Sequence, residues 1–145
     1  MSDPDAAIDA RVAPAVSEPV FVKRRVGAFS STDLETYLRA NSVDTIALAG
    51  FSTSGVILST LCWAADRDFR VVVISDLCAD CEGSSRRCGA CLYVRAVCVC
   101  GRRSYSPTHN CAVLPAADKE VHDILTTKVF LKQAHVMTSA EILDA

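Results

Sequence analysis

Residues 48–60, LAGFSTSGVILST, are the stretch that decides the fold of this chain. An apolar segment, Thr45 to Ala49, leads into Gly50, a Ser/Thr-rich turn follows, and an apolar helix is predicted after the turn. A strand, a glycine turn and a helix in this order place the first N–H groups of the helix at the carboxyl edge of a sheet. Anionic groups and developing negative charge are stabilised there. The stretch therefore predicts a ligand or reaction site at this edge.

Strand and helix patterns alternate on both sides of this stretch. The predicted strands are 19–23, 45–49, 70–75 and 134–137, and the predicted helices are 32–40, 54–66 and 118–128. The residues expected to face inward are Leu34, Tyr37 and Leu38 in one helix and Val121, Ile124 and Leu125 in another. Two capping boxes are predicted, Thr32 with Glu35 and Thr138 with Glu141. The alternation indicates an α/β fold with a mostly parallel sheet.

Length and charge restrict the class of protein. A chain of 145 residues is one domain's worth. Its net charge of −2 gives no reason to expect nucleic acid or an anionic membrane as a partner. No apolar run approaches the ~20 residues that a membrane span needs. The first residues also lack the basic and apolar regions of a signal peptide. We therefore expect a cytoplasmic protein whose eight cysteines do not form a disulfide framework.

One window, residues 81–117, differs from the rest of the chain. It is rich in Cys and Arg and lacks hydrophobic periodicity. A structureless connection of this length is unusual inside a compact domain. We therefore predict a loose N-terminal segment at 1–18, one α/β domain made of 19–80 and 118–145, and a disordered insert at 81–117.

The cysteines of this region raise the alternative of a metal site. Cys78 and Cys81 form one C-x2-C pair, and Cys88 and Cys91 form a second. Four thiolates can hold zinc tetrahedrally, but zinc ribbons usually separate their pairs by ~15–20 residues. We expect no metal and no cofactor, and we keep a zinc-binding interaction module as an alternative.

Four segments of the chain resemble the isochorismatase-like family, also called the cysteine hydrolase superfamily. They are 22–34 (VKRRVGAFSSTDL), 48–66, 71–80 (ending in DLCAD) and 120–143. The resemblance implies a Rossmann-like layered fold and a hydrolase that acts on an amide or a vinyl ether of a small molecule. It also implies a catalytic Asp, Lys and Cys, in which the thiolate attacks a carbonyl whose oxyanion lies at the helix start.

Only part of that catalytic group is matched in this sequence. Lys23 matches the catalytic lysine, whereas the nucleophile position, six residues after Gly50, is Val56. No Asp in an apolar strand matches the catalytic aspartate. The resemblance places a cis peptide bond at Phe51-Ser52. The expected substrate contacts are Phe51, Ser52, Thr53 and Gly55, although the serine and threonine residues are first expected to cap the helix.

The thiol-dependent reaction should therefore not proceed, although family members that cleave isochorismate also lack the cysteine. Whether the chain is an enzyme is left open. Cys62 is expected to be a small core residue rather than a displaced nucleophile, and His122 a surface or packing residue.

In the family, two further strands precede the predicted strand at 19–23 and lie inside the sheet. Without them, strand edges are exposed and association into a homo-oligomer is expected.

One hypothesis is that the gene is wrongly drawn, with a start that is too late and a translated intron at 81–117. Three functions remain: a truncated, impaired hydrolase for a small-molecule substrate, a non-catalytic relic that binds a small molecule or a partner through an anion pocket at 52–56, and the zinc module.

Overall fold

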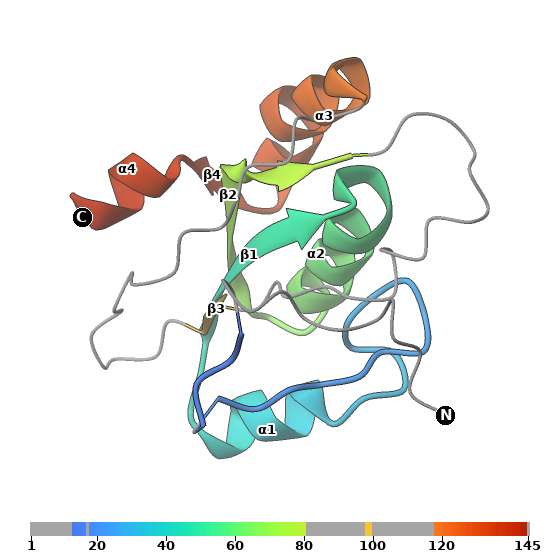
Figure 1. The fold of residues 1–145 in the computed structure, drawn as a ribbon, viewed down its shortest axis with the longest axis vertical. Coiled ribbons are helices and arrows are strands. Elements are labelled where there is room, and N and C mark those ends of the chain that lie inside the picture. Colours follow the sequence, from blue (N-terminus) through green and yellow to red (C-terminus); the bar gives the residue numbers. More distant parts are fainter. Residues whose placement is uncertain (1–12, 17, 81–97, 100–117, 145) are drawn as a thin grey trace.

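The computed structural model describes residues 13–16, 18–80, 98–99 and 118–144. From α1 onward, and apart from β3, its elements follow the α/β order that the sequence predicts (Figure 1). They are α1 (Leu34–Ala40), β1 (Thr45–Phe51), the π-helical turn η3 (Thr53–Ile57), α2 (Leu58–Ala65), β2 (Arg70–Ala79), β3 (Cys98–Val99), α3 (Lys119–Ile124), the π-helical turn η5 (Leu125–Val129), the 3-10 turn η6 (Phe130–Lys132), β4 (His135–Met137) and α4 (Ser139–Leu143). In these ranges no helix has the length and apolar character needed to cross a membrane.

The four strands form one sheet in the order β3-β1-β2-β4. β1 pairs with β2 and β2 with β4 in parallel, whereas β3 runs antiparallel to β1 through Ile46–Val99 and Ala47–Cys98. Helix α2 lies on one side of the sheet and α4 on the other (Figure 1). The prediction of an α/β fold with a mostly parallel sheet is confirmed. The edge of β1 that was expected to be exposed is paired at two residues with β3, which comes from the Cys/Arg-rich window.

One hydrophobic core joins the segments before and after that window. Alternate residues of β1 and β2 face α2, and their side chains belong to one buried cluster with residues of α1, α2 and η6. Its fully or almost fully buried members include Leu34, Leu38, Ile46, Leu48, Ile57, Leu61, Val71, Val73 and Phe130. The presence of Phe130 in this cluster means that residues after 118 complete the same core as residues before 80.

The segment predicted as the first strand, 19–23, is not a strand in the structure. Its side chains still alternate, with Phe21 and Lys23 turned inward and Val20 and Val22 exposed. A strand also needs a hydrogen-bonded ladder with a neighbour, and none of the sheet's pairings involves this segment. The prediction of a strand at 19–23 is wrong, and the missing ladder partner explains the difference.

Two predictions about helix ends and faces need correction. Thr32 and Glu35 form no capping box: the Thr32 hydroxyl donates to the Ala28 carbonyl at 2.6 Å, and Glu35 pairs with Arg67 at 2.5 Å. Of the three residues expected to face inward after Asp118, only Leu125 is buried, while Val121 and Ile124 are 36% and 44% exposed. The inward residues are instead Leu125, Thr126 and Phe130, because η5 and η6 depart from the α-helical period.

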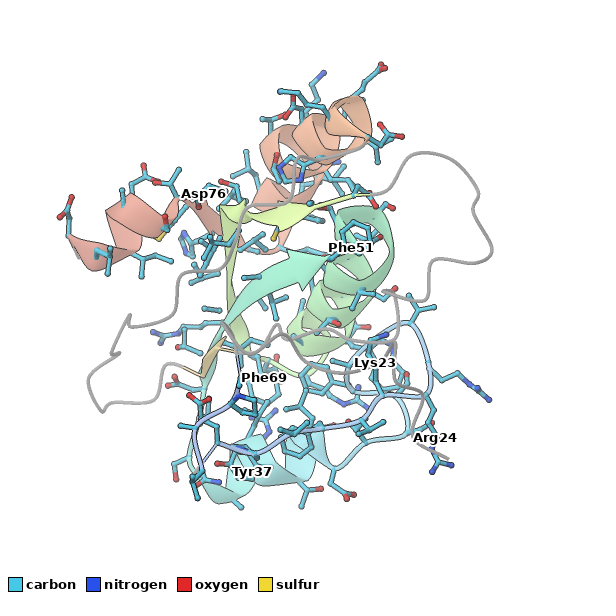
Figure 2. The ribbon with its side chains drawn as sticks, viewed as in Figure 1. Lys23, Arg24, Tyr37, Phe51, Phe69 and Asp76 are labelled. Carbon is cyan, nitrogen blue, oxygen red and sulfur yellow. The ribbon has the colours of Figure 1, made fainter. Side chains whose placement is uncertain are left out.

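The second capping box is confirmed at the start of α4. The Thr138 side chain accepts the Glu141 N–H, and the Glu141 carboxylate accepts the Thr138 N–H. The Thr138 hydroxyl also donates to the Glu141 carboxylate, at 2.8 Å. The two hydrogen bonds that this carboxylate accepts, the one from the Thr138 backbone N–H first and the one from the Thr138 hydroxyl second, lower the pKa of Glu141. Because the folded-state pKa is the lower one, the stabilisation is present above the unfolded pKa and is lost as the pH falls through the folded pKa. Asp76 of β2 also accepts the Ser139 N–H at 2.8 Å, which ties α4 to the sheet (Figure 2).

Gly50 is required by the backbone at the end of β1. Its φ is 124°, and the register of β1 against β2 shifts between Leu48 and Gly50. We expect Gly50→Ala to lower the free energy of unfolding by about 1–3 kcal/mol, because L side chains rarely adopt this φ. Chemical denaturation followed by circular dichroism measures the change.

Gly27→Ala is the matched control for this prediction. Gly27 lacks a positive φ, and an added Cβ would lie 3.5 Å from the Ser59 Cβ, which is ordinary contact. We expect its stability to change by no more than about 0.5 kcal/mol. An equal loss in both variants would contradict the assignment of strain to Gly50.

Candidate functional site at the start of the helix after β1

The turn between β1 and the following helix forms the centre of the candidate site. The Phe51-Ser52 peptide bond is cis, as the family resemblance implies. Ser52 is the N-cap: its Oγ accepts the Gly55 N–H at 3.2 Å, and its carbonyl accepts the N–H groups of Val56 and Ile57 at 2.9 and 3.0 Å. The expected capping role of Ser52 is confirmed.

Two side chains from elsewhere in the chain bind the same turn. Asp80, which follows β2, is 2% exposed, and its Oδ2 accepts the Ser54 N–H at 2.8 Å. His122 of α3 has its Nδ1 3.0 Å from the Thr53 hydroxyl, and Thr53 is completely buried. Sequence reasoning assigned neither residue to the site, although Asp80 closes the DLCAD segment after a strand.

These contacts use the hydrogen-bond donors at the helix start. The N–H groups of Ser54 to Ile57 all have acceptors inside the chain. The carboxylate of Asp80 lies at the helix N-terminus, where an anion would be favoured. In the anion pocket predicted at 52–56, the N–H groups of Ser54, Gly55 and Val56 are therefore occupied in the structure.

Lys23, the matched catalytic lysine, is buried. It is 6% exposed, and its Nζ donates to the Arg25 carbonyl at 3.1 Å, so it is not an ordinary solvated lysine (Figure 2). The segment after Lys23 runs along the helix. A Cβ placed on Gly55 would be 3.8 Å from the Val26 side chain, and the Ala28 N–H donates to the Thr60 hydroxyl at 3.0 Å.

The nucleophile position contains a buried apolar side chain. Val56 is 2% exposed in η3, directly after the turn. Cys62 lies further along the helix, packs against the hydrophobic core and has its Sγ 3.8 Å from the Gln133 Oε1. The expectation that Cys62 is a packing residue agrees with this position.

The substrate contacts predicted from the sequence mostly serve the turn itself. Phe51 is half-buried and pairs with Ala79 at the end of β1. Ser52 and Thr53 are buried and use their hydroxyl groups within the chain, and Gly55 lies against Val26. Their role in substrate binding stays a prediction.

Of the four cysteines in the zinc alternative, the structure describes only Cys78. Its side chain belongs to the hydrophobic core, is 7% exposed and has its Sγ 3.9 Å from the Leu48 carbonyl. Cys81, Cys88 and Cys91 lie outside the described residues. Within the described ranges no group of three or more His, Cys, Asp or Glu side chains could hold a metal ion. A zinc site through Cys78 would require this thiol to leave the core.

The mostly parallel sheet with helices packed on it defines a Rossmann-like α/β domain. Its candidate site is the turn at the carboxyl end of β1, where the cis peptide lies. Comparison with known families is specific. The Isochorismatase domain matches residues 1–98, more than half of the chain, and the chain belongs to the isochorismatase family.

Two similar curated proteins are amide-cleaving enzymes by name. The chain is 40% identical over 78 residues to maleamate amidohydrolase of Pseudomonas putida, covering 54% of this chain and 37% of that one. It is 36% identical over 75 residues to N-carbamoylsarcosine amidase of an Arthrobacter species, covering 52% of this chain and 28% of that one. The chain thus spans between about a quarter and two fifths of the length of these relatives.

The solved structures agree with the family. A cysteine hydrolase from Pseudomonas syringae pv. phaseolicola matches with a TM-score of 0.71 and 27% identity, covering 98% of this chain and 55% of that chain. The family assignment and the fold predicted from the sequence are both confirmed. The prediction that 81–117 is a foreign insert stays a prediction, and the family match itself extends to residue 98.

Proposed function

We propose that this chain contains the small-molecule hydrolase site of its family in an impaired form, directed to an amide or a vinyl ether. The family membership and the amide-cleaving relatives support the reaction class. The observation that carries the impairment is Val56, an apolar side chain buried at the position where the family resemblance implies the nucleophilic thiol.

The chemistry follows from the groups that remain. Thiol-dependent amide hydrolysis needs an electron pair on sulfur to attack the carbonyl carbon, and a valine side chain has none. It also needs N–H donors for the oxyanion, and those of residues 54–57 are already bonded within the chain. Lys23, at the position of the family's catalytic lysine, is retained, so binding without turnover is the expected behaviour towards amides.

A paired assay of hydrolysis and binding tests this proposal. We expect the purified chain to hydrolyse maleamate and N-carbamoylsarcosine about 10⁴–10⁶-fold more slowly than the relatives that carry those names, because losing a nucleophile costs that order of rate.

We expect Lys23→Ala to weaken maleamate binding, measured by calorimetry. Arg24→Ala is its control, because Arg24 is exposed (Figure 2). Amide turnover at the relatives' rate would contradict the impairment, and absence of maleamate binding would contradict the amide-site assignment.

Isochorismate distinguishes the two substrate classes. A vinyl ether can be hydrolysed without a thiol, since family members that lack the cysteine cleave isochorismate. Turnover of isochorismate without turnover of either amide would assign the chain to vinyl-ether hydrolysis.

We further propose that the chain associates into a homo-oligomer. Val20 and Val22 lie on a segment outside the sheet, and their side chains are 52% and 67% exposed. These exposed apolar side chains support association with a second copy of the chain. Light scattering after gel filtration measures the mass, and a monomer at all concentrations would contradict this part of the proposal.

A further inference from the structure

We infer that Asp80 and His122 are positioning residues that hold the turn at Thr53 and Ser54, and that they fix the orientation of the helix start where the site is formed. The expected loss of ligand binding when these contacts are removed rests on the proposed function. The expected loosening of the turn does not depend on it. Neither residue has a role in the hydrolytic group that the family resemblance implies.

Two separate parts of the chain bind two consecutive residues of the turn. Asp80 follows β2 and His122 belongs to α3, and they bind Ser54 and Thr53 respectively. The two bonds join residues 26 and 69 positions apart in the sequence. A turn held from both sides in this way has less freedom than one held only by its own N-cap.

One residue of each contact is buried. Asp80 is 2% exposed and Thr53 is 0% exposed, so a polar group left without its partner here would remain away from water. The negative charge of Asp80 also lies at the positive end of the helix dipole. Both effects favour the bonded arrangement over one in which the turn has moved.

The Thr53–His122 pair also has the distance of a nucleophile and its general base, 3.0 Å. Its burial excludes that role in this structure, because a completely buried hydroxyl group cannot contact a substrate carbonyl. The hydroxyl is instead a point of attachment for α3. The pair therefore positions the turn and does not attack.

The two residues also lie on opposite sides of the Cys/Arg-rich window. Asp80 is the last residue before it, and His122 lies four residues after residue 118, where the described chain resumes. Both flanks of the window are thus bonded to one turn. The geometry of the site depends on contacts from both parts of the predicted domain.

Amide hydrogen exchange in the full chain tests the Asp80 contact. We expect Asp80→Ala to accelerate exchange of the Ser54 N–H by about tenfold or more relative to the Leu61 N–H in α2, because the acceptor of the Ser54 N–H is removed. Asp80→Asn keeps an oxygen that can accept the same N–H, so we expect it to restore the ratio to within about threefold of the original chain. An unchanged ratio in Asp80→Ala, or equal acceleration in both variants, would overturn the inference.

The unmodified chain offers a second measurement in case Asp80→Ala does not fold. A scalar coupling across the hydrogen bond, from the Ser54 nitrogen to the Asp80 carboxyl carbon, is expected in the NMR spectrum.

The His122 contact is tested by two variants. We expect the Thr53 side chain to average between rotamers in His122→Phe and to keep one rotamer in His122→Asn, whose amide can replace Nδ1. Absence of the coupling, or no difference between the two His122 variants, would overturn the inference.

Maleamate binding separates this inference from the proposed function. We expect Asp80→Ala to weaken binding by about fivefold or more and Asp80→Asn to retain it. If the original chain does not bind maleamate, the proposed amide site fails, and the exchange ratio still decides the role of Asp80. If it binds and Asp80→Ala binds equally well, the positioning effect on the ligand is wrong.

Discussion

Phe130→Ala is expected to lower the free energy of unfolding by about 3–5 kcal/mol. Phe130 is completely buried, and it is the largest fully buried side chain among the described residues. It lies in η6, after the Cys/Arg-rich window, but belongs to the same core cluster as Ile46 and Val73 from before it. Truncation to alanine removes the buried ring and leaves a cavity between these segments. Urea denaturation monitored by circular dichroism measures the loss.

Leu131→Ala is the matched control, because Leu131 is the next residue and is 58% exposed. We expect it to change the stability by no more than about 0.5 kcal/mol. Since small domains are stable by only about 5–15 kcal/mol, complete loss of a cooperative transition in Phe130→Ala alone would agree with the prediction. Equally small effects in the two variants would show that residues after 118 do not complete the core.

The second large effect is expected in a rebuilt chain. We expect a variant without residues 81–117, with an added upstream strand that carries an Asp joined before Met1, to fold cooperatively and remain soluble. Adding Val56→Cys should then raise maleamate hydrolysis by about 10³-fold or more, because the thiol, the carboxylate and Lys23 would form the family's catalytic group. The kcat/KM of the rebuilt chain with and without Val56→Cys measures the gain.

Two controls separate the thiol from the change in packing. Val56→Ala in the rebuilt chain alters the same buried position without adding a nucleophile, and Lys23→Ala in the Val56→Cys background removes the matched lysine. Both should show no gain. Aggregation of the rebuilt chain would remove the main support for the truncation and insert hypotheses. Equal rates for Val56→Cys and Val56→Ala would contradict the assignment of Val56 to the nucleophile position.

Local patterns predicted the elements around the site. Hydrophobic periodicity and turn residues were sufficient to predict β1, β2 and the apolar helix after Gly50. Ser52 and the pair Thr138–Glu141 were recognised as caps because each bonds within three residues along the chain. Thr32 and Glu35 show where this reasoning fails: Glu35 pairs with Arg67, a distant residue that the local pattern does not contain.

The sequence by itself therefore determined the family, the strand–turn–helix junction at residues 48–60 and the order of α1, β1, α2, β2, α3 and β4, because these are expressed in neighbouring residues. Tertiary structure alone decided the burial of Lys23, the pairing of β3 with β1 and the contacts of Asp80 and His122 with one turn. It also decided that Phe130 completes the core. Each of these depends on which distant segments pack together, and neither propensity nor spacing along the chain carries that information.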